Sequence, residues 1–226
     1  MTDATTAAGR AAAYWNAPDT VAEFRSLGVR PYLTDLLGRV PVDGPALDLG
    51  CGGGRNSVAL LERGFDVLAV DLHDGMVDAT RARTAGYPSG RVTVRQGAAH
   101  AIPADDGTFA LVVCYGVLHN AVDRAQWETA VGEIRRVLRP GGRLALNTFT
   151  SETLDPRLRP GTGDGQYLLP DDVPMTLLPD ARILDAFAGA GLHTEGGTHS
   201  YVRDLEVGPR AVLRCVLRRG PRRGED

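Results

Sequence analysis

The sequence predicts an α/β fold in which a mostly parallel sheet is covered by helices on both faces. Three observations support this prediction. Short apolar runs alternate with helical patterns along residues 44–150. A glycine-rich loop connects the first apolar run to a helix, and the next apolar run ends in an acid. The last two apolar runs, at 193–204 and 210–219, are separated by a short turn, which predicts an antiparallel hairpin.

The elements expected from this pattern follow in chain order. The first residues, up to about 13, are rich in Ala and Thr and are expected to be mobile. Asp19 can cap a helix over 20–27, and Pro31 suits the first position of a helix that ends near Arg39. The expected strands of the sheet's parallel part are 46–49, 65–71, 91–96, 109–116 and 143–150. The expected helices among and after them are 55–64, 74–85, 123–138 and 180–192.

The glycine loop and the acid after the second strand predict a nucleoside site. Gly50, Gly52 and Gly54 let the backbone approach a ligand that a Cβ atom would exclude. Asp71 lies 19 residues after Gly52, close to the spacing of about 20 residues between a glycine loop and an acid that binds ribose. The charge of Asp48 would repel a pyrophosphate and would suit a cationic amino group. Loop spacing and Asp48 thus disfavour a nicotinamide-dependent oxidoreductase, which stays open as an alternative.

Residues 48–54, DLGCGGG, resemble motif I of the class I S-adenosylmethionine-dependent methyltransferases, whose core reads DxGxGxG. The continuation GRNSVALLERGFDVLAVD is similar to the small-molecule branch of that family, the tellurite-resistance-like and methyltransferase type 11-like enzymes. The resemblance covers about 44–150. It implies a Rossmann-like seven-stranded sheet in the order 3-2-1-4-5-7-6 with strand 7 antiparallel, and S-adenosyl-L-methionine as the cofactor.

The same resemblance implies which residues surround the cofactor. Leu72 would cover one face of the adenine, and Ala98 stands where the family usually has an Asp that accepts the adenine amino group. A lost hydrogen bond of this kind costs about 0.5–1.5 kcal/mol. The expected cofactor-binding residues are Asp48, Gly50, Cys51, Gly52, Asp71, Leu72, Ala98, Ala99, Cys114 and Tyr115.

Candidates for catalysis and acceptor binding lie in less regular parts of the chain. His119 follows the fourth strand and is the candidate general base, because histidine titrates near neutral pH. A packed histidine without a catalytic role is the alternative at this position. Residues 1–40 are expected to form a helical lid, and 151–179, rich in Pro, Gly and Asp, a substrate-recognition insert. The candidate acceptor contacts are Tyr14, Trp15, His119, Tyr167 and His199.

Composition limits the classes of partner. The formal net charge of −3 disfavours nucleic acid, whose binding proteins are usually basic. No apolar run is long enough to span a membrane, and the N-terminus lacks the basic and apolar regions of a secretory signal. Cys51, Cys114 and Cys215 have neither metal-ligand spacing nor an even count, so neither a metal site nor a disulfide is expected.

Together these observations predict a cytoplasmic enzyme, monomeric or homodimeric, that forms one domain over 1–226 with a disordered tail at 220–226. The expected reaction is methyl transfer to an oxygen, nitrogen or sulfur atom of a small molecule, as in specialised metabolism. Two alternatives stay open beside the oxidoreductase: a non-methylating enzyme on this fold, and a regulatory protein that binds S-adenosylmethionine.

Overall fold

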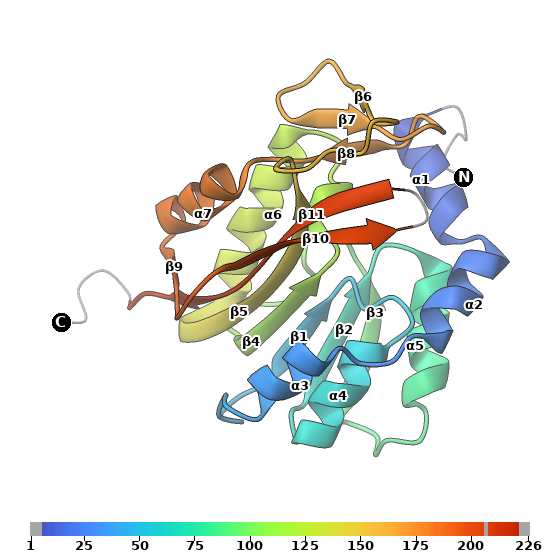
Figure 1. The fold of residues 1–226 in the computed structure, drawn as a ribbon. Helices are drawn as coiled ribbons and strands as arrows, with labels where there is room; N and C mark the ends of the chain where they lie inside the picture. Colours follow the sequence, from blue (N-terminus) through green and yellow to red (C-terminus); the bar gives the residue numbers. More distant parts are fainter. Residues whose placement is uncertain (1–5, 206–207, 222–226) are drawn as a thin grey trace.

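The computed structural model describes residues 6–205 and 208–221, so most of the predicted tail lies outside the described residues. Its main sheet has seven strands along one path (Figure 1). When these seven strands are numbered 1 to 7 in chain order, their order across the sheet is 3-2-1-4-5-7-6. The predicted sheet order is therefore confirmed. From one edge to the other the strands are β3 (Val92–Gln96), β2 (Val67–Asp71), β1 (Ala46–Leu49), β4 (Phe109–Tyr115), β5 (Leu138–Thr150), β11 (Gly208–Arg219) and β10 (His199–Leu205).

The hairpin at the far edge is also confirmed, because β11 runs antiparallel to both β5 and β10. The run predicted as one strand over 193–204 is divided. Its first part, β9 (Leu192–Thr194), pairs with the end of β11, and β10 pairs with the beginning of β11. Gly196 has a positive φ of 84° between the two parts, so the backbone turns away from the ladder there.

The fifth strand begins earlier than predicted. Helix α6 ends at Val137, and Leu138 already pairs with Phe109 of β4. The register then shifts before Leu111 pairs with Arg143. The Pro140-Gly141-Gly142 segment, which was expected to separate helix and strand, is thus an irregular start of β5.

Helices cover both faces of the parallel half of the sheet (Figure 1). On one face lie α3 (Pro31–Leu37), α4 (Arg55–Arg63) and α5 (Asp74–Thr84), and on the other lie α6 (Arg124–Val137) and α7 (Asp180–Gly189). Each face has its own apolar core, with Phe65 and Leu60 in the first and Trp127 and Phe187 in the second. Every residue of β1 and β4 is buried, as expected for strands packed on both sides.

The N-terminal segment is more ordered than predicted. Helix α1 spans Ala7–Trp15, and Thr6 caps it by accepting a hydrogen bond from the Gly9 N–H at 3.0 Å. Five of its nine residues are alanine, which favours a helix over a mobile segment. Helix α2 (Pro18–Ser26) begins before Asp19, so the predicted cap at Asp19 is wrong.

The segment 151–179 contains a small three-stranded sheet in the order β6 (Arg159–Pro160), β7 (Gln166–Leu168) and β8 (Pro174–Thr176). In Figure 1 this sheet lies beside α1, above the ends of the main strands. A separate apolar cluster around Leu158, Met175 and Leu177 stabilises it. Strands of two or three residues are too short to produce a recognisable alternation, so the sequence pattern did not reveal them.

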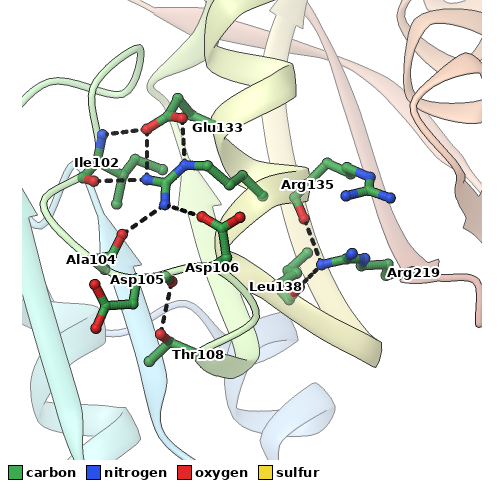
Figure 2. A network of polar contacts seen from close by, with 10 residues as sticks. Ile102, Ala104, Asp105, Asp106, Thr108, Glu133, Arg135, Leu138 and Arg219 are labelled. Atoms are coloured by element: carbon green, nitrogen blue, oxygen red, sulfur yellow. Dashed lines mark hydrogen bonds and ion pairs between the residues drawn. The ribbon is translucent and has the colours of Figure 1, made fainter. Parts of the chain in front are cut away.

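Arg136 on α6 connects the helix to the loop that follows β3. Figure 2 labels its partners Ile102, Ala104, Asp106 and Glu133. Its guanidinium donates to the carbonyls of Ile102 and Ala104 at 3.0 and 2.8 Å. It also contacts Glu133 and Asp106, and Glu133 accepts from the Ile102 N–H at 2.8 Å. These contacts fix the position of the loop relative to the sheet.

In the part of the chain that the structure describes, no helix combines the length and apolarity needed to cross a bilayer.

We expect Arg136→Ala to lower the free energy of unfolding by about 2–3 kcal/mol, because it leaves two backbone carbonyls and Glu133 without their charged donor. Urea denaturation followed by circular dichroism measures this loss. The control is Arg182→Ala, which removes a surface ion pair with Asp164 and should cost much less than Arg136→Ala, because solvent screens exposed pairs. Equal losses in both variants would contradict the role of Arg136 in fixing the loop after β3.

Candidate functional site

A cavity of 590 Å³ lies at the carboxyl ends of the parallel strands β1 to β4, within the size range of ligand pockets. This is the edge where open α/β sheets bind ligands. Eight of the predicted site residues line it, namely Trp15, Gly50, Gly52, Asp71, Leu72, Ala98, Ala99 and Tyr115. Val173 and Pro174, from the segment 151–179, line its far side.

The glycine loop adopts a conformation that side chains would disrupt. Gly50 and Gly52 have positive φ angles of 71° and 53°. A Cβ atom on Gly50 would lie 2.2 Å from the Val117 side chain, and one on Gly53 would lie 2.3 Å from the Phe24 carbonyl oxygen. The loop backbone is therefore packed closely while it forms one wall of the cavity.

Asp71 connects the end of β2 to this loop. One carboxylate oxygen accepts a hydrogen bond from the Gly52 N–H at 2.9 Å, and the other accepts from the His73 N–H at 3.1 Å. Burial raises the pKa of the carboxyl group, and the hydrogen bonds oppose that effect. Each oxygen retains further acceptor capacity toward the cavity that Asp71 lines.

Helices α1 and α2 are held against the cavity by specific contacts. The Trp15 ring stacks on His73 with centroids 6.1 Å apart, and it meets Phe24 edge-on at 5.3 Å. The Asn16 Oδ1 accepts from the Gly75 N–H at 2.9 Å, at the start of α5. The residues expected to form a lid therefore form part of the cavity wall.

Arg83 of α5 adds a second connection between the lid and the loop. Its Nη1 donates to the carbonyl oxygens of Arg25, Leu27 and Gly53 at 3.2, 3.0 and 3.2 Å. The end of α2 and the glycine loop thus share one guanidinium donor.

The family model of a methyltransferase domain matches residues 46–142, which span β1 to the beginning of β5. The match includes the glycine loop and Asp71. This part of the chain is similar to the class I S-adenosylmethionine-dependent methyltransferases. The cofactor of this family is S-adenosyl-L-methionine.

Individual relatives are consistent with this family. An uncharacterized methyltransferase of Mycobacterium tuberculosis is 43% identical over 100 residues, which cover 44% of this chain and 37% of the relative. A Streptomyces fradiae protein is 31% identical over 66% of this chain, and the match covers 51% of that protein. The chain thus spans about half or less of the length of the curated relatives it matches.

Solved structures share the methyltransferase fold at low identity. The 1,6-didemethyltoxoflavin-N1-methyltransferase of Burkholderia thailandensis, with its substrate and S-adenosylhomocysteine bound, has a TM-score of 0.68 and 19% identity. The alignment covers 95% of this chain and 87% of that chain. The [4+2]-cyclase SpnF has a TM-score of 0.61 and 19% identity. That alignment covers 84% of this chain and 83% of the cyclase chain.

Asp48 lies beneath the loop and does not line the cavity. It is fully buried and accepts hydrogen bonds from Ser57 Oγ at 2.6 Å and Asn56 Nδ2 at 3.5 Å. Burial raises its pKa to about 6, and the two hydrogen bonds oppose this shift. The carboxylate fixes the start of α4 and is not positioned to contact a ligand's amino group directly.

The two cysteines predicted at the cofactor are also buried beneath the cavity surface. Thr80 Oγ1 donates to Cys51 Sγ at 3.3 Å and to the Gly52 carbonyl at 2.7 Å. Burial raises the pKa of the Cys114 thiol to about 12. Neither cysteine lines the cavity, so both act as small packed residues.

His119 is not brought to the cavity. Its side chain is buried, and its ring packs on Phe149 with centroids 4.3 Å apart. Its Nδ1 accepts a hydrogen bond from the Phe149 N–H at 3.2 Å, so a neutral ring carries its proton on Nε2. Burial and the charge of Arg210 lower its pKa to about 3. This geometry matches the packed-histidine alternative and gives no support to a general base at this position.

The remaining acceptor candidates lie outside the cavity lining. Tyr14 is 49% exposed and meets Trp15 edge-on, while Tyr167 is half-buried on β7. His199 is exposed on β10, with its ring 5.2 Å from that of Tyr201. Only Trp15 among the five candidates contributes to the cavity wall.

Several polar residues of the cavity were not predicted. They are Asn16, His73, Asp74, Gln96, His100, Asn120 and Gln126. His73 and Gln96 could have been found, because each lies at or just beyond the end of a predicted strand on the ligand-binding edge. Asn16 ends helix α1 as its C-cap and Gln126 belongs to α6, and sequence position alone does not reveal which side of such a helix or cap faces a ligand.

The cavity fits the family's cofactor in the features that the structure provides. Glycine backbone, an acid at the end of β2 and the apolar Leu72 surround one continuous space. Gln96 lies beside Ala98, and its amide donates to the Leu72 carbonyl at 3.0 Å. Ala98 and Ala99 line the cavity after β3 and supply no carboxylate at these two positions.

A pH experiment tests the buried state of His119. Its folded pKa lies below its unfolded value, so protonation of the unfolded chain lowers stability as pH falls. Relative to His119→Gln, the wild type should lose about 2 kcal/mol of unfolding free energy between pH 7 and pH 5. Urea denaturation at both pH values measures the difference. The control is His193→Gln, at an exposed position, which should lose as much unfolding free energy between the two pH values as the wild type. If His119→Gln also loses as much as the wild type, the burial of His119 is contradicted.

Proposed function

We propose that this chain transfers the methyl group of S-adenosylmethionine to a small-molecule acceptor. The observation that carries the proposal is the cavity formed by the glycine loop and Asp71 and bordered by Trp15 of α1. When bound, S-adenosylmethionine would supply an activated methyl group, and the protein would supply binding and orientation.

The residues of the chain would divide this work. Asp71 would accept hydrogen bonds from ribose hydroxyls, and Leu72 with Ala98 would border the adenine. The helices α1 and α2 would exclude water and restrict the acceptor to a productive orientation, which is a large source of rate acceleration. Since His119 is buried and neutral, any proton of the acceptor would leave through another group, and His73 and His100 are the histidines that line the cavity.

A small acceptor is favoured by the size and lining of the site. The cavity of 590 Å³ is bordered by α1 and by Val173 and Pro174 of the segment 151–179, and this volume is in the range of small-ligand pockets. The Burkholderia structure with bound 1,6-didemethyltoxoflavin is an example of a small acceptor on this fold. We extend the proposal to a cytoplasmic enzyme of specialised metabolism, with 1–40 as lid and 151–179 as recognition insert.

A non-methylating activity is the second candidate, because the cyclase SpnF shares this fold. The two are separated by the fate of the cofactor: methyl transfer converts S-adenosylmethionine into S-adenosylhomocysteine, while a non-methylating reaction leaves it unchanged.

We expect Asp71→Ala to raise the Kd of S-adenosylhomocysteine tenfold or more, equivalent to about 1.4 kcal/mol, because the ribose loses its acceptor. Isothermal titration calorimetry measures the change. Asp78→Ala is the control, since Asp78 forms only a surface ion pair with Arg81 on α5. An unchanged affinity in the Asp71 variant would remove this residue from the cofactor site.

A second experiment tests the reaction itself. Purified protein is incubated with S-adenosylmethionine and a panel of small hydroxyl, amino and thiol compounds, and S-adenosylhomocysteine and methylated product are measured by mass spectrometry. We expect both to appear together with at least one acceptor, and to decrease with Asp71→Ala. Conversion of an acceptor without S-adenosylhomocysteine would favour the non-methylating candidate. Tight cofactor binding with no conversion across the panel would favour a regulatory protein.

A further inference from the structure

Four arginine side chains gather around two tyrosines next to the cavity but outside its lining. We call this group the arginine patch: Arg30, Arg55, Arg203, Arg214, Tyr32 and Tyr201. The residues come from four elements that are distant in sequence, the start of α3, the start of α4, β10 and β11. On this face of the sheet α3 and α4 cover β1 and neighbouring strands, and β10 and β11 form its edge (Figure 1).

Arg214 is held in place by aromatic rings. Its guanidinium carbon lies 4.3 Å from the centroid of the Tyr32 ring and 5.5 Å from that of Tyr201. Ring contacts orient the guanidinium plane and leave its N–H groups at the edges free to donate. Among the described residues, Arg214 has no hydrogen bond to an acceptor and no ion pair.

The other three arginines add positive charge, and none of them forms an ion pair with another described residue. The Nη1 atom of Arg55 is buried and has no hydrogen-bond partner in the described part of the chain. Burial and the like charges of Arg30 and Arg203 lower the pKa of Arg55. Asp48 attracts Arg55 electrostatically, but its own hydrogen bonds are to Ser57 and Asn56.

Like charges that converge around a buried, unpaired donor favour an anion at this position. Guanidinium groups bind carboxylates and phosphates through paired N–H donors, which makes arginine the residue suited to such ligands. We propose that the arginine patch binds a carboxylate or phosphate group of the methyl acceptor. The assignment to the acceptor rests on the proposed methyl transfer.

Tyr115 connects the patch to the cavity. It lines the cavity at the end of β4, and its ring meets that of Tyr32 with centroids 5.3 Å apart. An acceptor anchored on the patch would therefore lie on the Tyr115 side of the cavity. His199, whose ring contacts Tyr201, borders the same patch.

The patch is distinct from the expected cofactor contacts. None of its four arginines lines the cavity, whose wall is formed by the glycine loop, Asp71 and the residues after β3 and β4. The carboxylate of the cofactor is the other possible source of an anion, so the experiment must measure cofactor affinity separately.

The test uses the full chain saturated with S-adenosylhomocysteine and three probes: phenyl phosphate, benzoate and phenol. Calorimetry should give an affinity for phenyl phosphate or benzoate about tenfold or more above that for phenol, which lacks the anionic group. Arg214→Gln should weaken binding of the anionic probe by about fivefold or more. The Kd of S-adenosylhomocysteine should stay within about twofold of wild type.

Arg218→Gln is the matched control, because Arg218 is an exposed arginine on the same strand, paired with Glu195 at 3.9 Å near the opposite end of the sheet. It should bind the anionic probes like the wild type. If Arg214→Gln does not fold, the exposed Arg203→Gln provides the same comparison. Circular dichroism and the unfolding midpoint verify the fold of each variant.

Three results would overturn the inference. Phenol could bind as tightly as the anionic probes, or Arg218→Gln could weaken them as much as Arg214→Gln. S-adenosylhomocysteine could lose affinity in parallel in Arg214→Gln, which would assign the patch to the cofactor carboxylate. Failure of the proposed function is recognised separately, because S-adenosylhomocysteine would then fail to bind the wild type while phenyl phosphate still depended on Arg214.

Discussion

The hydrogen bond between the Asp71 carboxylate and the Gly52 N–H is the contact on which the site depends. It joins the residue that ends β2 to the loop that follows β1, and so it fixes the relative position of two elements separated by a whole helix. The loop donates this bond in a conformation with positive φ at Gly50 and Gly52. The second oxygen of Asp71 orients the His73 backbone, and the His73 ring in turn supports Trp15 of α1. One carboxylate thus organises the loop, the strand end and the contact with the N-terminal helix.

Much of the fold could be predicted because it follows from local patterns. The parallel strands are short apolar runs, and the glycines at 50, 52, 54 and 64 lie where positive φ is required. Asp123 caps α6 through the Gln126 N–H at 2.8 Å, as its position before an apolar periodicity indicated. These features depend on neighbours in sequence, and a pattern reveals such neighbours directly.

The site was only partly predictable, because its residues are selected by the direction of their side chains. Asp48 and Gly50 are two residues apart, yet the first is buried under the loop and the second lines the cavity. His119 follows the strand that ends at Tyr115, but the turn directs its ring toward Phe149 on β5. The arginine patch is assembled from β10, β11 and the starts of two helices, so no spacing in the sequence indicated it. Tertiary packing decides such cases.

Arg83 affects the rate at which ligands could enter and leave the cavity. It is one donor shared by Arg25, Leu27 and Gly53, so moving the end of α2 away from the loop would break hydrogen bonds that share this guanidinium. The Phe24 carbonyl oxygen would lie only 2.3 Å from a Cβ on Gly53, which shows that the same junction is close-packed. Opening on this side would therefore be a concerted event with a barrier of its own. The residence time of a bound product would then depend on a residue of α5 that does not line the cavity.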